Sequence, residues 1–249
     1  MTLLEALLVG LAGVAAGTIN VVVGSGTLIT FPALLAVGYS PVVANVSNSL
    51  GLVPGSVAGA IGYRRELSGQ RARVSRLLPA SVLGAITGAI LLLALPPAAF
   101  KAIVPVFIIA AIVVIALQPR VSRWVMRHRP HGAEHTRWLV VVVFATGIYG
   151  GYFGAAQGIL LMAIMGVAIP DDLQRLNGLK NVLAGAVNLV AGLIFVAIAD
   201  IAWGPVALIA AGSTIGGVLG ARYGRRLSSP ALRAVIVAVG LFAVVRLIV

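Results

Sequence analysis

Long apolar runs separated by short polar loops make up almost the whole chain. Most of these runs are about 20 residues long, the length that an α-helix needs to cross about 30 Å of hydrocarbon. The pattern predicts an all-α, polytopic integral membrane protein of about ten helices. The expected segments are 3–22, 26–38, 42–63, 77–95, 99–118, 137–154, 157–169, 176–199, 202–221 and 231–249.

Composition supports this reading. Hydrophobic residues make up 60% of the 249 residues and charged residues 10%, whereas soluble domains have about 25% charged residues. The net charge of +12 comes from clusters between the apolar runs, as the positive-inside rule produces, so it indicates anionic membrane lipid rather than nucleic acid as a partner. The chain has no cysteine, which excludes disulfides and thiolate chemistry.

The two halves of the chain share an order of motifs. At an offset of about 130 residues, Gly17 and Gly24 align with Gly147 and Gly154; at 132, Asn45 aligns with Asn177. This order predicts two five-helix repeats, 1–118 and 137–249, joined by a basic cytoplasmic linker at 119–136.

Arginine-rich loops test the orientation of these repeats. Loops 64–76, 118–137 and 222–233 carry five, five and four arginines, whereas loop 199–203 carries none. Placing the basic loops in the cytoplasm makes the repeats inverted, with both termini outside. If the second and seventh segments were re-entrant while all the others crossed, the arginines of loop 222–233 would lie outside. Ten complete crossings are therefore expected.

The second and seventh segments are short, and each follows a glycine-rich break. Such segments at matching places in two halves are typical of a transporter site near the membrane midplane. Gly24, Gly26, Gly154 and Gly158 allow non-helical turns there, and the N–H groups at a new helix start favour an anion. Close helix packing is the alternative role for these glycines, and it is the expected one for Gly13-xxx-Gly17, Gly84-xxx-Gly88 and Gly216-xxx-Gly220.

Polar residues near the breaks complete the predicted site. Amides and hydroxyls are costly in hydrocarbon without partners, so they are expected to face a cavity or to bond between helices. Lys180, about one turn inside an apolar segment, either attracts an anion or extends to the cytoplasmic interface. The predicted substrate-binding residues are Asn20, Gly24, Ser25, Gly26, Asn48, Ser49, Gly154, Gln157, Gly158, Lys180, Asn181 and Asn188.

The acidic residues narrow the chemistry further. All six carboxylates lie at segment ends or in loops, which disfavours a cation pump, since cation and proton sites need a carboxylate at depth. The three histidines of the central loop are expected to be solvated rather than to bind a metal. With no cofactor, metal or catalytic constellation expected, the chain is predicted not to be an enzyme.

The paired motifs resemble those of the TauE/SafE sulfite exporters. The likeness rests on AGTINVVVGSGTLITFPALLAVGYSPVVANVSNS, on GIYGGYFGAAQGILLMAIMGVAIPDDLQRLNGLKNVLAGAVN and on GSTIGGVLGARYGRRL. It implies a multi-pass permease of the bacterial plasma membrane for a small anion such as sulfite or a sulfonate. Where the family tends to Gly-Gly-Gly, this chain has Gly24-Ser25-Gly26, and Gln157 replaces another glycine.

These observations together predict a secondary transporter that moves a small anion by alternating access. A drug/metabolite-type exporter of neutral or cationic solutes and a non-transport membrane subunit are the alternatives. Assembly as a homodimer is left open.

Overall fold

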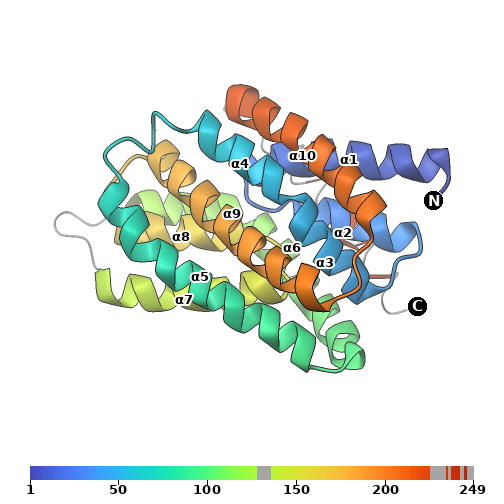
Figure 1. Cartoon of the computed structure of the whole chain (residues 1–249). Coiled ribbons are helices and arrows are strands. Elements are labelled where there is room, and N and C mark those ends of the chain that lie inside the picture. The colour runs from blue at the N-terminus through green and yellow to red at the C-terminus, as the bar shows by residue number, and fades with distance from the viewer. Residues whose placement is uncertain (128–135, 225–233, 235–236, 242–243, 246–249) are drawn as a thin grey trace.

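The structure is a computed structural model that describes residues 1–127, 136–224, 234, 237–241 and 244–245. Figure 1 shows a bundle of helices, which confirms the all-α prediction. The helices are α1 (Leu3–Val22), α2 (Thr27–Ala36), α3 (Pro41–Gly51), α4 (Val53–Gly62), α5 (Arg71–Ala94), α6 (Pro97–Arg127), α7 (Thr136–Tyr152), α8 (Gln157–Ala168), α9 (Leu173–Ile198) and α10 (Trp203–Tyr223).

Five of the described helices are long and apolar enough to cross a membrane, namely α1, α5, α6 over Pro97–Leu117, α9 and α10. α6 continues beyond the predicted segment end at residue 118 and reaches Arg127, so it includes the first part of the predicted linker. The rest of that linker up to residue 135, the three histidines and most of the predicted tenth segment lie outside the described residues.

The predicted third segment is divided into α3 and α4 at Leu52. Pro54, in the first turn of α4, has no N–H to continue the hydrogen-bond ladder of α3. The carbonyl of Gly51 at this break accepts a hydrogen bond of 2.9 Å from Ser213 of α10. The break therefore stays satisfied by a side chain from the other half of the chain.

α2 and α8 are too short to cross a membrane alone. They have 10 and 12 residues, about 15 and 18 Å of helix against about 30 Å of hydrocarbon. In Figure 1, α1 and α7 enter from opposite ends of the bundle, and α2 and α8 fold back toward those ends. The expectation of ten complete crossings is therefore wrong for these two segments. If α1 and α7 also stop half-way, each hairpin returns to its side of entry, and the sidedness of the loops is the same as with two complete crossings.

Glycines bring helices of the two halves into close contact, as predicted for the three Gly-xxx-Gly pairs. α1 packs on α10, and α5 packs on α7. A Cβ atom added to Gly17 would lie 2.6 Å from the Cα of Ser213, and one added to Gly84 would lie 2.9 Å from the Cα of Gly147. Neither approach leaves room for a side chain, so small residues define both crossings.

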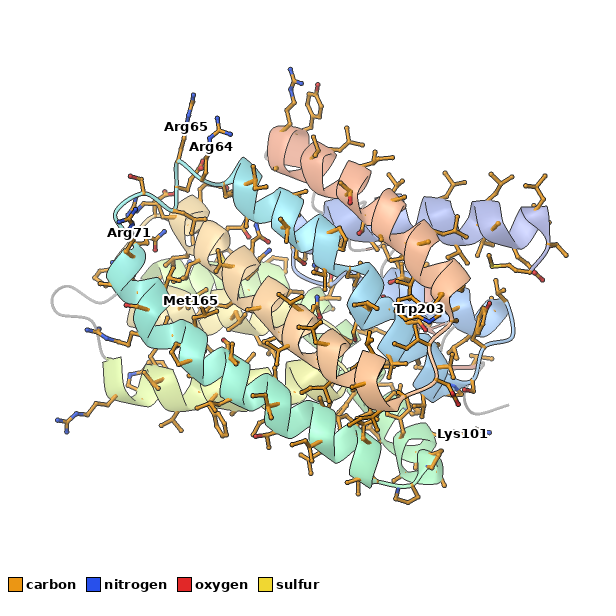
Figure 2. All side chains as sticks on the ribbon, in the orientation of Figure 1. Arg64, Arg65, Arg71, Lys101, Met165 and Trp203 are labelled. Atoms are coloured by element: carbon orange, nitrogen blue, oxygen red, sulfur yellow. The ribbon has the colours of Figure 1, made fainter. Side chains whose placement is uncertain are left out.

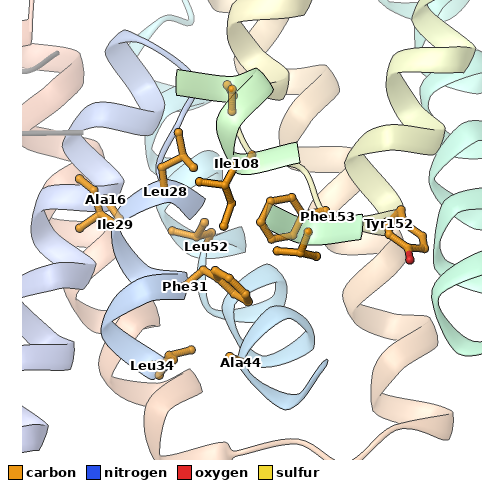
Figure 3. Packing of buried hydrophobic residues seen from close by; sticks show 14 of the residues in the cluster. Ala16, Leu28, Ile29, Phe31, Leu34, Ala44, Leu52, Ile108, Tyr152 and Phe153 are labelled. Atoms are coloured by element: carbon orange, nitrogen blue, oxygen red, sulfur yellow. The ribbon is translucent and has the colours of Figure 1, made fainter. Parts of the chain in front are cut away.

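An aromatic and aliphatic core surrounds the ends of α1 and α7 (Figure 3). The rings of Phe31 on α2 and Phe153 after α7 meet edge to face, with centroids 5.1 Å apart. Leu28, Leu52 and Ile108 are almost fully buried around them. The core thus joins both helical hairpins to α6, and it excludes solvent from one side of the breaks.

Charge separates the two ends of the bundle. Figure 2 shows Arg64, Arg65 and Arg71 at one end, and Lys101 and Trp203 toward the opposite end. The positive-inside rule assigns the arginine end to the cytoplasm.

Candidate substrate site at the junction of the broken helices

α1 and α7 end in the same way. The N–H groups of Val23 and Gly24 both donate to the carbonyl of Ile19, and those of Phe153 and Gly154 both donate to the carbonyl of Tyr149. Gly24 and Gly154 then take φ values of +88° and +76°, which glycine adopts without steric cost. The predicted turns at the two glycine-rich breaks are confirmed.

The two breaks touch each other. Gly158 in the first turn of α8 donates its N–H to the carbonyl of Gly24, at 3.0 Å. A Cβ atom added to Gly158 would lie 2.5 Å from the Cα of Gly24. Only a pair of glycines allows this backbone approach. We call this contact and the polar residues around it the junction.

Lys180 of α9 is buried beside the junction, with 1% of its surface exposed. Its Nζ atom donates to the carbonyls of Asn20 and Val21, at 2.9 Å each. These carbonyls belong to the last turn of α1, where no intrahelical donor remains. The ammonium therefore caps the negative end of the α1 dipole, and Lys180 does not extend to an interface.

Two amides of α9 support the same helix end. Asn177 and Asn181 donate to the carbonyl of Val21, at 3.2 and 3.4 Å. Together with Lys180 they meet the requirement that irregular backbone at membrane depth has protein partners.

α3 caps the end of α7 in the way that α9 caps the end of α1. Asn45 donates to the carbonyl of Tyr152 at 3.0 Å, and Asn45 and Asn177 are the pair that align at an offset of 132. Each half of the chain thus caps the first helix of the other half through an asparagine on its own third segment. Asn45 and Asn177 were absent from the predicted set, although their shared offset was a signal in the sequence.

The start of α2 is held by amides from two helices. Asn48 of α3 donates to the hydroxyl of Thr27 at 3.3 Å and accepts from the hydroxyl of Thr30. Asn20 of α1 accepts from the N–H of Gly26 and donates to the hydroxyl of Ser56, at 3.4 Å each. These hydrogen bonds fix the start of α2 to α1 and α3.

The start of α8 differs from that of α2, because the side-chain amide at this helix start belongs to Gln157 of α8 itself and not to a neighbouring helix. The side chain of Gln157 lies over Gly150 of α7, where an added Cβ atom would be 2.5 Å from the Nε2 atom. Ala156, which precedes α8, has a φ of +59°. This left-handed conformation is strained for alanine, and the junction is where that strain is located.

Two buried donors of the junction have no partner. Ser25 and Gln157 are 1% and 4% exposed, and Ser25 Oγ and Gln157 Nε2 make no hydrogen bond within the described chain. Buried polar groups are rarely left unpaired. Ser25 follows Gly24 and Gln157 precedes Gly158, so both donors belong to residues next to the glycine contact.

The remaining predicted residues play different parts. The hydroxyl of Ser49 donates to the carbonyl of Asn45 within α3, at 3.0 Å. Asn188 is half-buried on α9, and among the described residues no hydrogen bond connects it to the junction. The structure therefore gathers the predicted set around one contact, with Asn188 outside its hydrogen-bond network.

Carboxylates lie away from the junction. Among the described residues, no aspartate or glutamate is buried, and no group of three metal-ligating side chains occurs. In the part of the chain that the structure describes, the arrangement offers the free donors of Ser25 and Gln157 and a single cation, beside two free acceptors, Asn45 Oδ1 and Asn177 Oδ1.

A cavity of about 530 Å³ opens at the end of the bundle opposite the arginines. Its walls come from the first turn of α3, the end of α5, the start of α6 and the end of α9, with Ser40, Lys101 and Asp200 as its polar residues.

The arginine end carries a cross-link between α5 and the α8–α9 loop. Asp171 accepts from Arg73 of α5 and from Arg175 of α9, the latter at 2.9 Å. The buried Gln70 also donates to the carbonyl of Arg175 at 2.9 Å. Partial burial acts to raise the pKa of Asp171, but hydrogen bonds from Arg73, the backbone of Asp172 and Arg175 outweigh it and hold the pKa below its usual value.

Known proteins similar to this chain are membrane proteins of bacteria. The profile of the family described as "Sulfite exporter TauE/SafE" matches residues 9–247. "Probable membrane transporter protein YfcA" of Escherichia coli K12 is 26% identical over 216 residues, which cover 85% of this chain and 76% of that protein.

Two further relatives agree. A "Probable membrane transporter protein" of Haemophilus influenzae is 25% identical over 210 residues, covering 84% of this chain and 81% of the relative. "Probable membrane transporter protein ORF9" of a Sinorhizobium species is 25% identical over 236 residues, covering 94% and 88%. No solved structure gives a significant match.

Proposed function

The chain belongs to the sulfite exporter TauE/SafE family and is a multi-pass membrane transporter, not an enzyme; within that role, we propose that it carries a small anion of the sulfite or sulfonate type. The anion binds at the junction between the two broken helices. The single observation that carries this proposal is the pair of unpaired, buried donors on Ser25 and Gln157 that flank the Gly24–Gly158 contact.

Lys180 supplies the charge at this site. An ammonium has three N–H donors, and two of those of Lys180 go to the α1 carbonyls. The third donor is available to an acceptor. The side chain of Lys180 also packs near Gly158, since a Cβ atom added to Gly158 would lie 3.0 Å from the Cδ atom of Lys180. A charge-assisted hydrogen bond from Lys180 would thus complete a set of three donors, with Ser25 and Gln157 as the others.

The other predicted residues hold the site together. Gly24, Gly26, Gly154 and Gly158 let the backbone turn and approach, and the amides and hydroxyl of the third segments fix the helix ends. The residues in these supporting roles are Asn20, Asn48, Ser49 and Asn181, and Asn188 lies two turns further along α9 from Asn181.

The two ends of the bundle suit alternating access. The cavity at the Lys101 end is open, and the arginine end is cross-linked through Asp171. The helix pairing supports an inverted repeat, since α1 packs on α10 and α7 packs on α5. The first predicted segment of each half thus packs on the fourth predicted segment of the other. We propose that these two units rock against each other in the plasma membrane of a bacterium.

A ligand-binding measurement tests the proposal. Binding to the native state raises stability by about 2.7 kcal/mol at a hundredfold excess of ligand over Kd, so sulfite or a sulfonate should raise the thermal midpoint of the purified protein. Ser25→Ala and Gln157→Ala should reduce this increase strongly. Ser81→Ala is the matched control, because Ser81 Oγ is equally buried and equally unpaired but lies on α5.

The outcomes separate the alternatives. An increase that survives both junction variants would remove the anion from the junction. Stabilisation by neutral or cationic solutes in place of anions would support a drug/metabolite-type exporter.

A further inference from the structure

Three arginines from two helix ends surround a hollow on the basic end of the bundle. The hollow has a volume of about 410 Å³ and is lined by Gly62, Arg64, Arg65, Glu66, Ala221 and Arg222. Arg64 and Arg65 follow α4, and Arg222 lies in the last turn of α10. Figure 2 shows Arg64 and Arg65 projecting from the body of the bundle, beside the end of α10.

The backbone holds these guanidinium groups together. A Cβ atom added to Gly62 would clash with the Cβ atom of Ala221, so α4 and α10 are in close contact directly below the arginines. Within the described chain, no hydrogen bond or ion pair engages the side chains of Arg64, Arg65 or Arg222; Arg222 instead lies over the ring of Tyr223, 5.5 Å from its centroid. Three like charges are thus kept close, with Glu66 as the one carboxylate of the lining.

The hollow lies at the depth of lipid headgroups. α10 is an apolar membrane-spanning helix that ends at Tyr223, and an aromatic ring at the end of such a helix marks the membrane–water interface. Basic pockets between helices on the cytoplasmic side favour anionic headgroups. Guanidinium groups bind phosphate through paired N–H donors.

We propose that this hollow binds the phosphate of an anionic phospholipid of the inner leaflet. Glu66 also lines it, so the lining carries three positive charges and one negative charge. Arg64 and Arg65 belong to the first half of the chain and Arg222 to the second, and the bound headgroup joins α4 to α10. The site is separate from the junction, and it does not depend on the nature of the transported solute.

Thermal unfolding in neutral detergent, followed by the fluorescence of the three tryptophans, tests this proposal. Phosphatidylglycerol should raise the midpoint, whereas phosphatidylcholine and inorganic phosphate should not. In the variant Arg64→Gln/Arg65→Gln/Arg222→Gln, the lipid concentration needed for half of the effect should rise by about a hundredfold, because each of the three basic residues near an anionic surface contributes roughly 1 kcal/mol, or about fivefold.

A second variant removes the same charge elsewhere. Arg120→Gln/Arg123→Gln/Arg127→Gln takes three exposed arginines from another basic hollow, at the end of α6, and should reduce the phosphatidylglycerol effect clearly less than the first variant does. An equal loss in both variants would overturn the proposal, and so would an effect of inorganic phosphate as large as that of the lipid.

The proposed function and this inference fail separately. If Arg64→Gln/Arg65→Gln/Arg222→Gln keeps the sulfite-induced shift, the fold is intact, and a loss of the lipid effect then belongs to the hollow alone. The variant Arg64→Lys/Arg65→Lys/Arg222→Lys keeps the charge but loses the paired guanidinium donors, so its lipid effect should lie between those of the parent and the glutamine variant. If it loses as much as the glutamine variant does, while its sulfite response is unchanged, electrostatic binding of the phosphate is contradicted.

Discussion

Single residues at the junction combine structural and ligand-binding roles. Lys180 satisfies carbonyls at the end of α1, and the same ammonium is the one cation buried among the described residues. A charge inside a membrane protein is retained when it has partners. The carbonyls account for the burial of Lys180, and its third donor accounts for its place in the proposed site.

Lys180→Met should therefore lower both stability and binding. Hydrogen bonds to charged groups contribute about 1.5–3 kcal/mol each, and methionine leaves the carbonyls of Asn20 and Val21 without Lys180. We expect the free energy of unfolding to fall by about 2–4 kcal/mol, measured by thermal unfolding, and the sulfite-induced shift to disappear. A variant with the midpoint and the sulfite response of the parent would show that Lys180 has neither role.

Glycine-to-alanine substitutions separate the steric cost of losing a close backbone contact from the gain in helix propensity. Gly158→Ala forces apart the backbones of α8 and α1, since its Cβ atom would lie 2.5 Å from Gly24 Cα, and an overpacked core costs about 1–3 kcal/mol. Gly10→Ala on α1 is the control, because its Cβ atom would meet nothing within 4 Å. It should be neutral or stabilise by up to about 1 kcal/mol. The thermal midpoints of the two variants should move in opposite directions or differ clearly, and equal midpoints would contradict a tight junction.

The sequence predicts the glycines and amides of this site but not all of their partners. The turns at Gly24 and Gly154 follow from glycine in an apolar run. The acceptors of Lys180, by contrast, are main-chain carbonyls of the other half, and main-chain atoms leave no mark in a sequence. The pairing of Arg73 with Asp171 spans 98 positions and is equally invisible.

Two features of the fold can be predicted from the sequence. The break between α3 and α4 follows from Gly51 and Pro54, both visible in the sequence. The reversal of α2 and α8 follows from their lengths once each is paired with the preceding helix. Counting each apolar segment as one crossing missed this, because hydrophobicity does not distinguish a half-way hairpin from a full crossing.

At the level of elements, the salt bridges of Asp171 to Arg73 and Arg175 should hold the cytoplasmic side closed. Since the chain has no native cysteine, Arg73→Cys/Asp171→Cys can be joined by a short bismaleimide without background. Cross-linking should abolish sulfite flux in proteoliposomes while the sulfite-induced thermal shift persists. Arg73→Cys alone, treated with the same reagent, is the control. Flux that is unaffected by the cross-link would show that this contact does not open during transport.

The same cross-link has a defined pH dependence. The pKa of Asp171 is depressed in the folded protein, so its contribution to stability is complete above the usual aspartate pKa of about 3.9 and is lost as pH falls through the lower folded value. Physiological pH therefore leaves the Asp171 contacts intact, and proton binding there does not drive opening near neutrality.

At the scale of the whole molecule, the proposed inverted repeat predicts which loops face which side. If both hairpins return to their side of entry, positions 2 and 201 face outward and position 68 faces the cytoplasm. Single cysteines at these positions should be labelled accordingly by a maleimide that cannot enter cells: strongly at 2 and 201, and at 68 only after lysis. The cysteine-free parent is the blank. Labelling of position 68 in intact cells, with positions 2 and 201 protected, would mean that the bundle sits the other way up. Labelling of positions 68 and 201 from the same side would contradict the inverted repeat, and the outward assignment of the Lys101 cavity would fail with it.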